Sequence, residues 1–222
     1  LVSRFGMAVG RNVYALPTSR VSYEFTLKVY RLLGLDTDHV ISDFTTYDLI
    51  DPNKKDQLME QLKEMNLNFT IGNPPYQLTT ERTSDEQIYP HFIDLGAQLV
   101  RRATLITPAR YLFDAGKTPK EWNQKILNDP HFKVILYKAN STEVFPNVDI
   151  KGGVAVIYHD QKTEFGKIGL YTAHDELRGI KKRVMKTHPE AFLDEIIYPQ
   201  NKFDLDKLLA DHPQLKKDIG SG

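Results

Sequence analysis

The chain has 222 residues, of which 41% are hydrophobic, enough for one sizeable core and an appended element. It contains no cysteine, which excludes disulfides, thiolate metal sites and cysteine nucleophiles. Lys+Arg and Asp+Glu both number 29, so the formal net charge is zero, which argues against a complete stand-alone nucleic-acid binder but allows a local basic face. No apolar run approaches the roughly 20 residues that span a bilayer, so we expect a soluble intracellular protein.

Apolar stretches rich in β-branched and aromatic residues recur along the chain and predict strands. They lie at 12–16, 39–44, 68–72, 103–108, 133–138 and 152–160, and a weaker candidate lies at 167–173.

Stretches with helical periodicity separate most of these strands. In the first of them, Val21 and Phe25 begin an apolar stripe and Gly34 is a plausible stop. The second starts at Asp51-Pro52, a good cap followed by a good first-turn residue. The predicted helices span 19–35, 51–67, 89–103, 118–130 and 174–197.

The alternation of strands and helices predicts an α/β fold with a mainly parallel sheet flanked by helices. No helix separates the strand at 152–160 from the one before it, so we expect an antiparallel edge. The pattern changes near residue 162, which predicts a catalytic domain at 1–162 and a C-terminal extension or connector at 163–222.

The stretch FTIGNPPYQ at 69–77 carries the chemistry. Asn73 and Pro74 offer a side-chain and a backbone carbonyl oxygen as acceptors, and Pro75 restricts the direction of the second. Tyr76 adds a flat aromatic face. Two acceptors beside an aromatic ring suit a planar heterocycle with an exocyclic amino group, whereas the simpler interpretation is a Pro-Pro turn that closes a strand.

This stretch looks like motif IV of the methyltransferases that act on exocyclic amino groups. Three further stretches resemble segments of adenine-N6 DNA methyltransferases from restriction–modification systems: VISDFTTYDL at 40–49 (motif III), ATLITPARYL at 103–112, and NSTEVFPNVDIKGGVAVIYHD at 140–160 (motif VIII). The resemblance covers roughly residues 12–162, with the motifs in the gamma-type order. It implies a Rossmann-like fold that uses S-adenosylmethionine (AdoMet).

In such enzymes the target adenine is flipped out of the duplex, because its N6 is otherwise paired and stacked. By resemblance, Asn73, Pro74, Pro75 and Tyr76 form the catalytic loop. Asn73 Oδ1 and the Pro74 carbonyl accept hydrogen bonds from N6, Tyr76 stacks on the base, and Phe145 packs against its other face. The alternative role of Phe145 is that of a plain core residue.

The resemblance also implies cofactor contacts, and basic side chains suggest contacts to DNA phosphates. Asp43, Phe44 and Asn73 are the candidates for AdoMet, although Asp43 is equally suited to capping a strand end. Arg110 and Lys151 are candidates for the DNA backbone, whereas the basic run at 181–186 is read as a solvated helix face. No metal is implied.

The expected cofactor signature, a strand followed by a glycine-rich turn, is poorly represented. VSRFGMAVGR at 2–11 has Gly6 and Gly10 but no preceding hydrophobic strand. We therefore expect an N-terminally incomplete catalytic domain, with the glycine-rich segment upstream of Leu1 and weak or no AdoMet binding by this piece alone. The alternative is a cofactor site that has diverged from the family pattern.

The resulting hypothesis is a site-specific DNA adenine-N6 methyltransferase of a bacterial or archaeal restriction–modification system. Its expected partners are double-stranded DNA and, fused or separate, a restriction endonuclease and a target recognition domain. Its expected location is the cytoplasm, in association with the nucleoid. The alternatives are a methyltransferase for protein glutamine or an RNA base, and a non-catalytic DNA-binding subunit.

Overall fold

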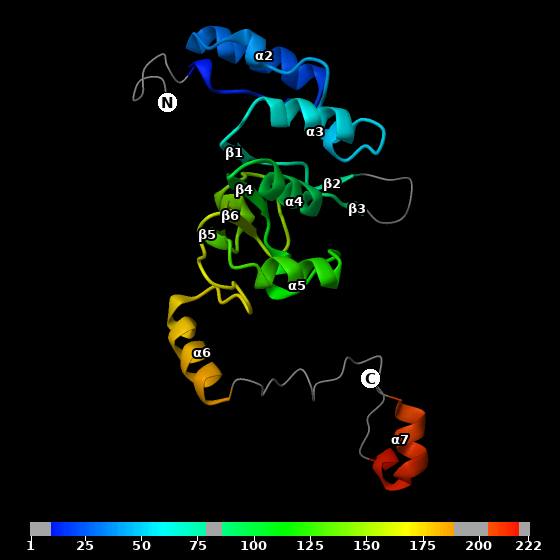
Figure 1. The fold of residues 1–222 in the computed structure, drawn as a ribbon. Helices are drawn as coiled ribbons and strands as arrows, with labels where there is room; N and C mark the ends of the chain where they lie inside the picture. Colours follow the sequence, from blue (N-terminus) through cyan, green and yellow to red (C-terminus); the bar gives the residue numbers. More distant parts are fainter. Residues whose placement is uncertain (1–9, 79–85, 189–203, 218–222) are drawn as a thin grey trace. The chain divides into compact units, whose positions relative to one another are not determined.

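The computed structural model describes residues 10–78, 86–188 and 204–217 (Figure 1). The chain forms two compact units, one up to Tyr171 and one from Thr172 onward. The division therefore falls later than the boundary that we predict near residue 162. Within the described ranges, no helix is long and apolar enough to cross a membrane.

A four-stranded sheet forms the centre of the first unit, in the order β1-β4-β6-β5 (Figure 1). β1 pairs parallel with β4, whereas β6 pairs antiparallel with both β4 and β5. Three of the four strands therefore run in one direction. Their bounds are Phe69–Gly72 for β1, Arg102–Pro108 for β4, Phe132–Lys138 for β5 and Val154–Asp160 for β6.

The predicted antiparallel edge is present, since the edge strand β5 pairs antiparallel with β6. β6 is reversed as expected, but it lies inside the sheet, and β5 is the edge strand. A loop, not a crossover helix, joins β5 to β6, so β6 folds back beside β5. Its side chains at Ala155 and Ile157 are buried, which suits a central position.

Four of the predicted helices form in the first unit. Gly34 ends α2, as the sequence predicts, and Ser19 caps its start. The predicted start of α3 at Asp51 is early, because the Asp51 carbonyl accepts hydrogen bonds in a turn that precedes the helix. The bounds are Arg20–Leu33 for α2, Lys55–Glu64 for α3, Tyr89–Leu99 for α4 and Lys120–Asn128 for α5.

Three predicted strands do not form. Residues 12–16 and 39–44 contribute only one isolated parallel bridge, between Ala15 and Val40. The short helical turns η2 (Thr37–His39) and η3 (Thr46–Leu49) flank this bridge and prevent a longer ladder. Residues 167–173 have no strand pairing either.

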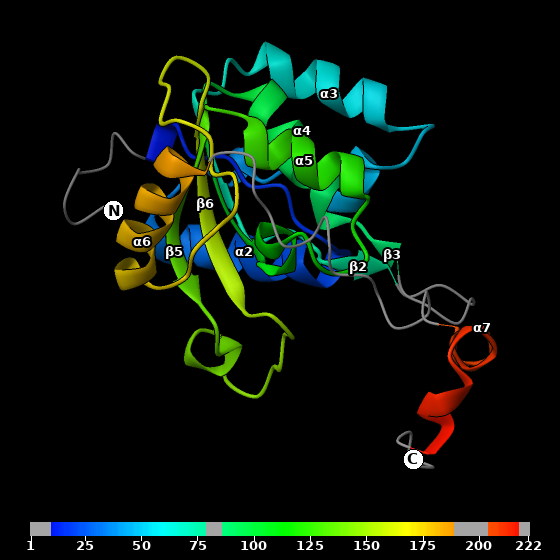
Figure 2. The same cartoon turned by 90° about the horizontal axis from the view of Figure 1, so that it is seen from below.

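Two clusters of buried side chains hold the first unit together. In the first, α4 and α5 cover one face of the sheet, with Ile93 and Ile126 packed in one cluster with Leu105 (Figure 2). In the second, α3 packs with α4 through Leu58 and Phe92. These buried faces explain why the stretches that form α3, α4 and α5 become helices, since helices of this length are marginal in water without tertiary packing.

Two short strands follow the sheet strand β1 and precede α4. They are β2 at Gln77–Leu78 and β3 at Glu86–Gln87, and they pair antiparallel. The second unit contains α6 at Asp175–Thr187, α7 at Leu205–Asp211 and the turn η8 at Pro213–Lys217. The predicted helix at 174–197 thus begins where expected, and its part beyond residue 188 lies outside the described residues.

Candidate functional site

Residues 73–76 form the loop that joins β1 to β2. β1 ends at Gly72 and β2 begins at Gln77, so the segment starts directly at the carboxyl end of a sheet strand. Asn73 is exposed and Pro74 is buried. The loop is tied to the start of α4, since the Ile88 N–H donates to the Tyr76 carbonyl at 3.0 Å.

The hydroxyl end of the Tyr76 side chain points into the protein. The ring packs against the cluster formed by α4, α5 and the sheet. Its hydroxyl is buried and has no hydrogen-bond partner among the described residues. Burial raises the pKa of Tyr76 to about 12, so the phenol is neutral at physiological pH. The ring is therefore fixed from behind by packing.

The sheet topology brings two more loops to the edge where this loop begins. β4 runs parallel to β1 and ends at Pro108, with Leu105 level with Gly72. β5 runs in the same direction and ends at Lys138, opposite the first residue of β6. The segments that follow β1, β4 and β5 therefore leave the sheet at the carboxyl ends of these strands, where ligands usually bind in such sheets.

The loop between β5 and β6 carries Phe145 and is internally braced. The Ser141 hydroxyl, whose residue is 2% exposed, donates to the Val148 carbonyl at 2.8 Å and accepts from the Ile150 N–H at 2.7 Å. The Phe145 N–H donates to the Ser141 carbonyl at 2.8 Å, and the Phe145 side chain is half-buried.

Sequence reasoning missed Ser141. The available signal was the Asn140-Ser141-Thr142 stretch, which is typical of a capped turn. In the structure, the Asn140 side-chain oxygen accepts from the Thr142 N–H at 3.1 Å and starts a short helical turn at Ser141–Glu143.

Arg110 and Lys151, the two cations expected near the DNA backbone, lie at this edge as well. Arg110 follows the end of β4 and Lys151 precedes β6, and both are exposed. The Ala109 N–H donates to the Gly153 carbonyl at 3.0 Å, which joins the two segments. The structure thus brings both cations to the edge that carries the loop at 73–76.

Asp43 and Phe44 lie on the side of α3. Asp43 is exposed, and its carboxylate accepts a hydrogen bond from the Ser42 hydroxyl at 2.9 Å. Phe44 packs against the cluster formed by α3 and α4, as does Leu78, which follows the loop at 73–76 by two residues. No hydrogen bond or ion pair among the described residues joins Asp43 to that loop. Gly6 lies outside the described residues.

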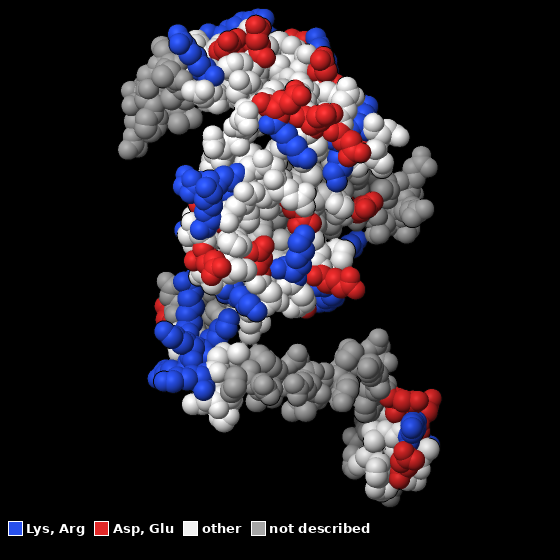
Figure 3. Space-filling model, viewed as in Figure 1, with Lys and Arg blue, Asp and Glu red and all other residues white. Residues whose placement is uncertain are grey.

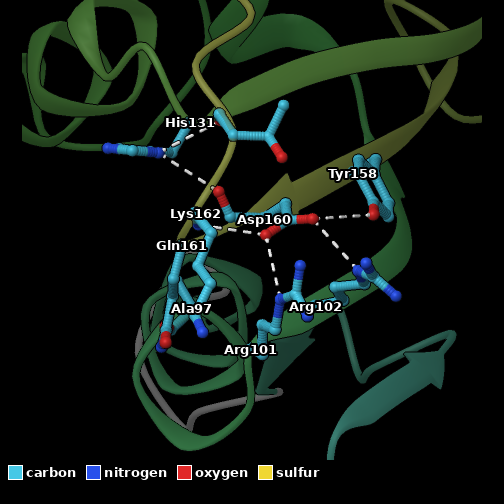
Figure 4. A network of polar contacts seen from close by, with 9 residues as sticks. Ala97, Arg101, Arg102, His131, Tyr158, Asp160, Gln161 and Lys162 are labelled. Carbon is cyan, nitrogen blue, oxygen red and sulfur yellow. Dashed lines mark hydrogen bonds and ion pairs between the residues drawn. The ribbon is translucent and has the colours of Figure 1, made fainter.

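The other two arginines that adjoin β4 lie at the opposite end of the sheet. Asp160 is 3% exposed, accepts from Arg102 Nε at 3.0 Å and lies 3.6 Å from Arg101 Nε (Figure 4). The Lys162 N–H donates to the same carboxylate at 3.0 Å. Hydrogen bonds from Lys162 and Arg102, with the nearby Arg101 charge, lower the pKa of Asp160 far below its usual value. This network joins β4 to β6 away from the candidate site.

The basic run at 181–186 lies on α6, in the second unit. Figure 3 shows lysines and arginines gathered on this helix. Its apolar residues Leu177, Ile180 and Val184 are about half exposed, at 47–48%. Most of its basic and apolar side chains are thus exposed, in keeping with a solvated helix face.

Comparison with curated proteins and with solved structures gave no match. Residues 23–145, more than half of the 222 residues, match the family model of the Eco57I restriction-modification methylase. The matched range runs from α2 to Phe145 and includes the loop at 73–76, all of β4 and Arg110. The chain therefore belongs to the Eco57I restriction-modification methylase family.

Proposed function

We propose that this restriction–modification methylase transfers a methyl group from AdoMet to N6 of an adenine flipped out of double-stranded DNA. The observation that carries the proposal is the position of the Asn73–Tyr76 loop at the carboxyl end of β1, on the same sheet edge as the loop that carries Phe145.

The loop offers acceptors for an amino group. The Asn73 side chain is exposed, so its carbonyl oxygen is available to a ligand, and the Pro74 carbonyl belongs to a backbone with little freedom. The amino lone pair of adenine is delocalised into the ring, which makes N6 a poor nucleophile. Two fixed acceptors favour a more tetrahedral nitrogen and aim its lone pair at the methyl donor. We infer that Asn73 Oδ1 and the Pro74 carbonyl fill these roles.

Tyr76 and Phe145 supply the aromatic surfaces. The Tyr76 ring is held by the core and by the backbone hydrogen bond from Ile88, so it is ordered before a base arrives. The loop of Phe145 is braced by Ser141. Stacking between two ordered rings compensates the unstacking energy of a flipped base.

The residues proposed for AdoMet fit its adenine end. The Asp43 carboxylate is exposed and accepts one hydrogen bond, from Ser42, so it retains capacity for an adenine amino group. Phe44 gives an apolar surface close to it in sequence, anchored in the α3 and α4 cluster. AdoMet, when bound, supplies an electrophilic methyl group on a sulfonium.

The test is product analysis with the full-length protein. Tritiated AdoMet is offered with double-stranded DNA, RNA or protein extract, and labelled DNA is digested to nucleosides. We expect label in N6-methyldeoxyadenosine. Label in protein or RNA alone would support the alternative substrates. Label in a methylated cytosine would show that adenine is not the target. Intact DNA binding without any label would support a non-catalytic subunit.

The wider assembly is part of the same proposal. A methylase of a restriction–modification system works beside an endonuclease and needs a module that reads the target sequence. The site described above accounts for binding one base and one methyl donor. We therefore propose that sequence recognition belongs to a separate recognition domain, fused or not. A pull-down of the full-length protein with its neighbouring gene products tests this.

A further inference from the structure

The backbone around Arg110 is held in place on both sides. Ala109 and Tyr111, its chain neighbours, are both fully buried, at 0% exposure. The Arg110 carbonyl accepts from the Ala115 N–H at 3.1 Å, and Ala109 is bonded to the turn before β6 through Gly153. The Arg110 side chain is exposed and therefore leaves a rigid stretch of backbone at the sheet edge.

Two glycines make room for its methylene chain. A Cβ at Gly152 would lie 2.3 Å from Arg110 Cγ, and one at Gly116 would lie 3.3 Å from Arg110 Cβ. Both glycines have positive φ, +85° and +102°, a conformation that other residues rarely adopt. The Gly152 carbonyl also accepts from the Tyr137 hydroxyl at 3.4 Å. The arginine chain thus lies against two bare stretches of backbone.

The guanidinium charge is not neutralised locally. Of the acidic side chains in the two adjoining loops, Glu143 pairs with Lys138 at 2.7 Å and Asp114 with Lys120 at 3.1 Å, and Asp149 forms no ion pair with Arg110. Among the described residues, no carboxylate lies within ion-pair distance of Arg110. A partly ordered, unpaired guanidinium is suited to bidentate binding of an oxyanion, because less side-chain entropy is lost on binding.

We propose that Arg110 binds the DNA phosphate next to the flipped nucleotide, with Gly116 and Gly152 holding its side chain ready. This inference rests on the proposed function, since it assumes that a base enters at the 73–76 loop. The neighbours of Arg110 favour DNA over the AdoMet carboxylate. Arg110 contacts the turn that ends the Phe145 loop, whereas the cofactor candidates Asp43 and Phe44 pack on the α3 side.

The test is the salt dependence of DNA binding by the full-length protein. Binding is measured by fluorescence anisotropy on a labelled duplex that the protein methylates. Each phosphate contact contributes about 0.9 to the slope of log K against log salt, so Arg110→Ala should lower the slope by about that much. Affinity should fall by about tenfold at low salt. Lys28→Ala, which removes an exposed charge on α2, is the matched control and should leave the slope unchanged.

Gly152→Val tests the role of the glycine without changing any charge. Displacement of the arginine chain should weaken DNA binding in the same direction as Arg110→Ala, with a folded far-UV spectrum. If Gly152→Val does not fold, Arg110→Lys is the second test, because it keeps the charge but not the forked guanidinium. It should retain the slope of log K against log salt but lose part of the affinity.

Other outcomes overturn the inference. An unchanged slope of log K against log salt in Arg110→Ala would show that Arg110 makes no phosphate contact. An unchanged slope with a raised KM for AdoMet would assign Arg110 to the cofactor carboxylate, and a lowered Tm with unchanged binding would make its role structural. Since binding is measured apart from methyl transfer, these results do not depend on whether adenine proves to be the target.

Discussion

The buried hydroxyl of Ser141 donates to the carbonyl of Val148 at 2.8 Å and closes the loop that carries Phe145. The same oxygen accepts from the Ile150 N–H at 2.7 Å, so one side chain satisfies both a backbone donor and a backbone acceptor. A loop at a sheet edge without such a brace would sample many conformations, and ordering it on substrate binding would cost conformational entropy.

Ser141→Ala should therefore loosen this loop. We expect a loss of about 1–3 kcal/mol in the free energy of unfolding, because two backbone groups lose their buried partner. Methyl transfer should fall as well, mainly through a higher KM for DNA. Thermal unfolding and steady-state kinetics measure the two effects. Thr142→Val is the control, since the exposed Thr142 hydroxyl donates only to Asn140, and it should change neither quantity much.

We expect the ring of Tyr76 to be needed for methyl transfer and its hydroxyl not to be. Tyr76→Phe removes a buried hydroxyl that has no partner among the described residues, so activity and stability should stay close to those of the parent protein. Tyr76→Ala removes the stacking surface, and transfer should fall by about 5- to 150-fold, as for loss of one base–aromatic stack. Single-turnover methylation measures both, and a large loss in Tyr76→Phe would contradict the stacking role.

Asn73→Ala should abolish most methyl transfer while DNA affinity is retained. The side chain is exposed, so its removal leaves the fold intact, but one of the two acceptors for N6 is lost. By analogy with the loss of one positioned hydrogen-bonding group in other active sites, we expect a decrease of about 10²- to 10³-fold in the transfer rate. Asn128→Ala, on the exposed surface of α5, is the amide control. Full activity in Asn73→Ala would refute the catalytic assignment.

The sequence was informative where periodicity and caps agree. The α2 helix follows its apolar stripe and ends at Gly34 as predicted, and β4 and β6 follow their apolar runs. The position of β6 inside the sheet was not predictable, because strand order depends on long-range pairing with β4. The apolar runs at 12–16 and 39–44 failed as strands, since local turns at η2 and η3 competed with sheet pairing.

The site was predictable only in part, for a similar reason. Asn73 to Tyr76 are adjacent in sequence and follow a strand, so their place at the sheet edge could be predicted. The contact of Arg110 with Gly152 joins residues whose proximity arises from the β4–β6 pairing, which no local pattern encodes. The brace at Ser141 depends on how the loop between β5 and β6 folds back on itself. The pairing of Arg102 with Asp160 likewise spans a long stretch of chain.

Asp160 makes the stability of the first unit dependent on pH. Hydrogen bonds from the Lys162 N–H and Arg102, with the nearby Arg101 charge, hold the pKa of this carboxyl far below its usual value. An aspartate in the unfolded chain titrates near about 3.9. A depressed pKa stabilises the folded state fully above that value, and this contribution is lost as the pH falls below about 4 towards the folded-state pKa.

Asp160→Asn should remove this contribution. At neutral pH the variant should unfold at a lower temperature, because the partly exposed Arg101 and Arg102 lose the buried carboxylate that pairs with them. Below about pH 4 the difference between the two melting temperatures should narrow, since the unfolded parent chain takes up a proton at this carboxyl while the folded form does so only at lower pH. Calorimetry at pH 7 and pH 3 measures both effects. Asp38→Asn, an exposed residue outside the network, should shift the curves little at either pH, and equal shifts for Asp160→Asn at the two pH values would contradict the linkage.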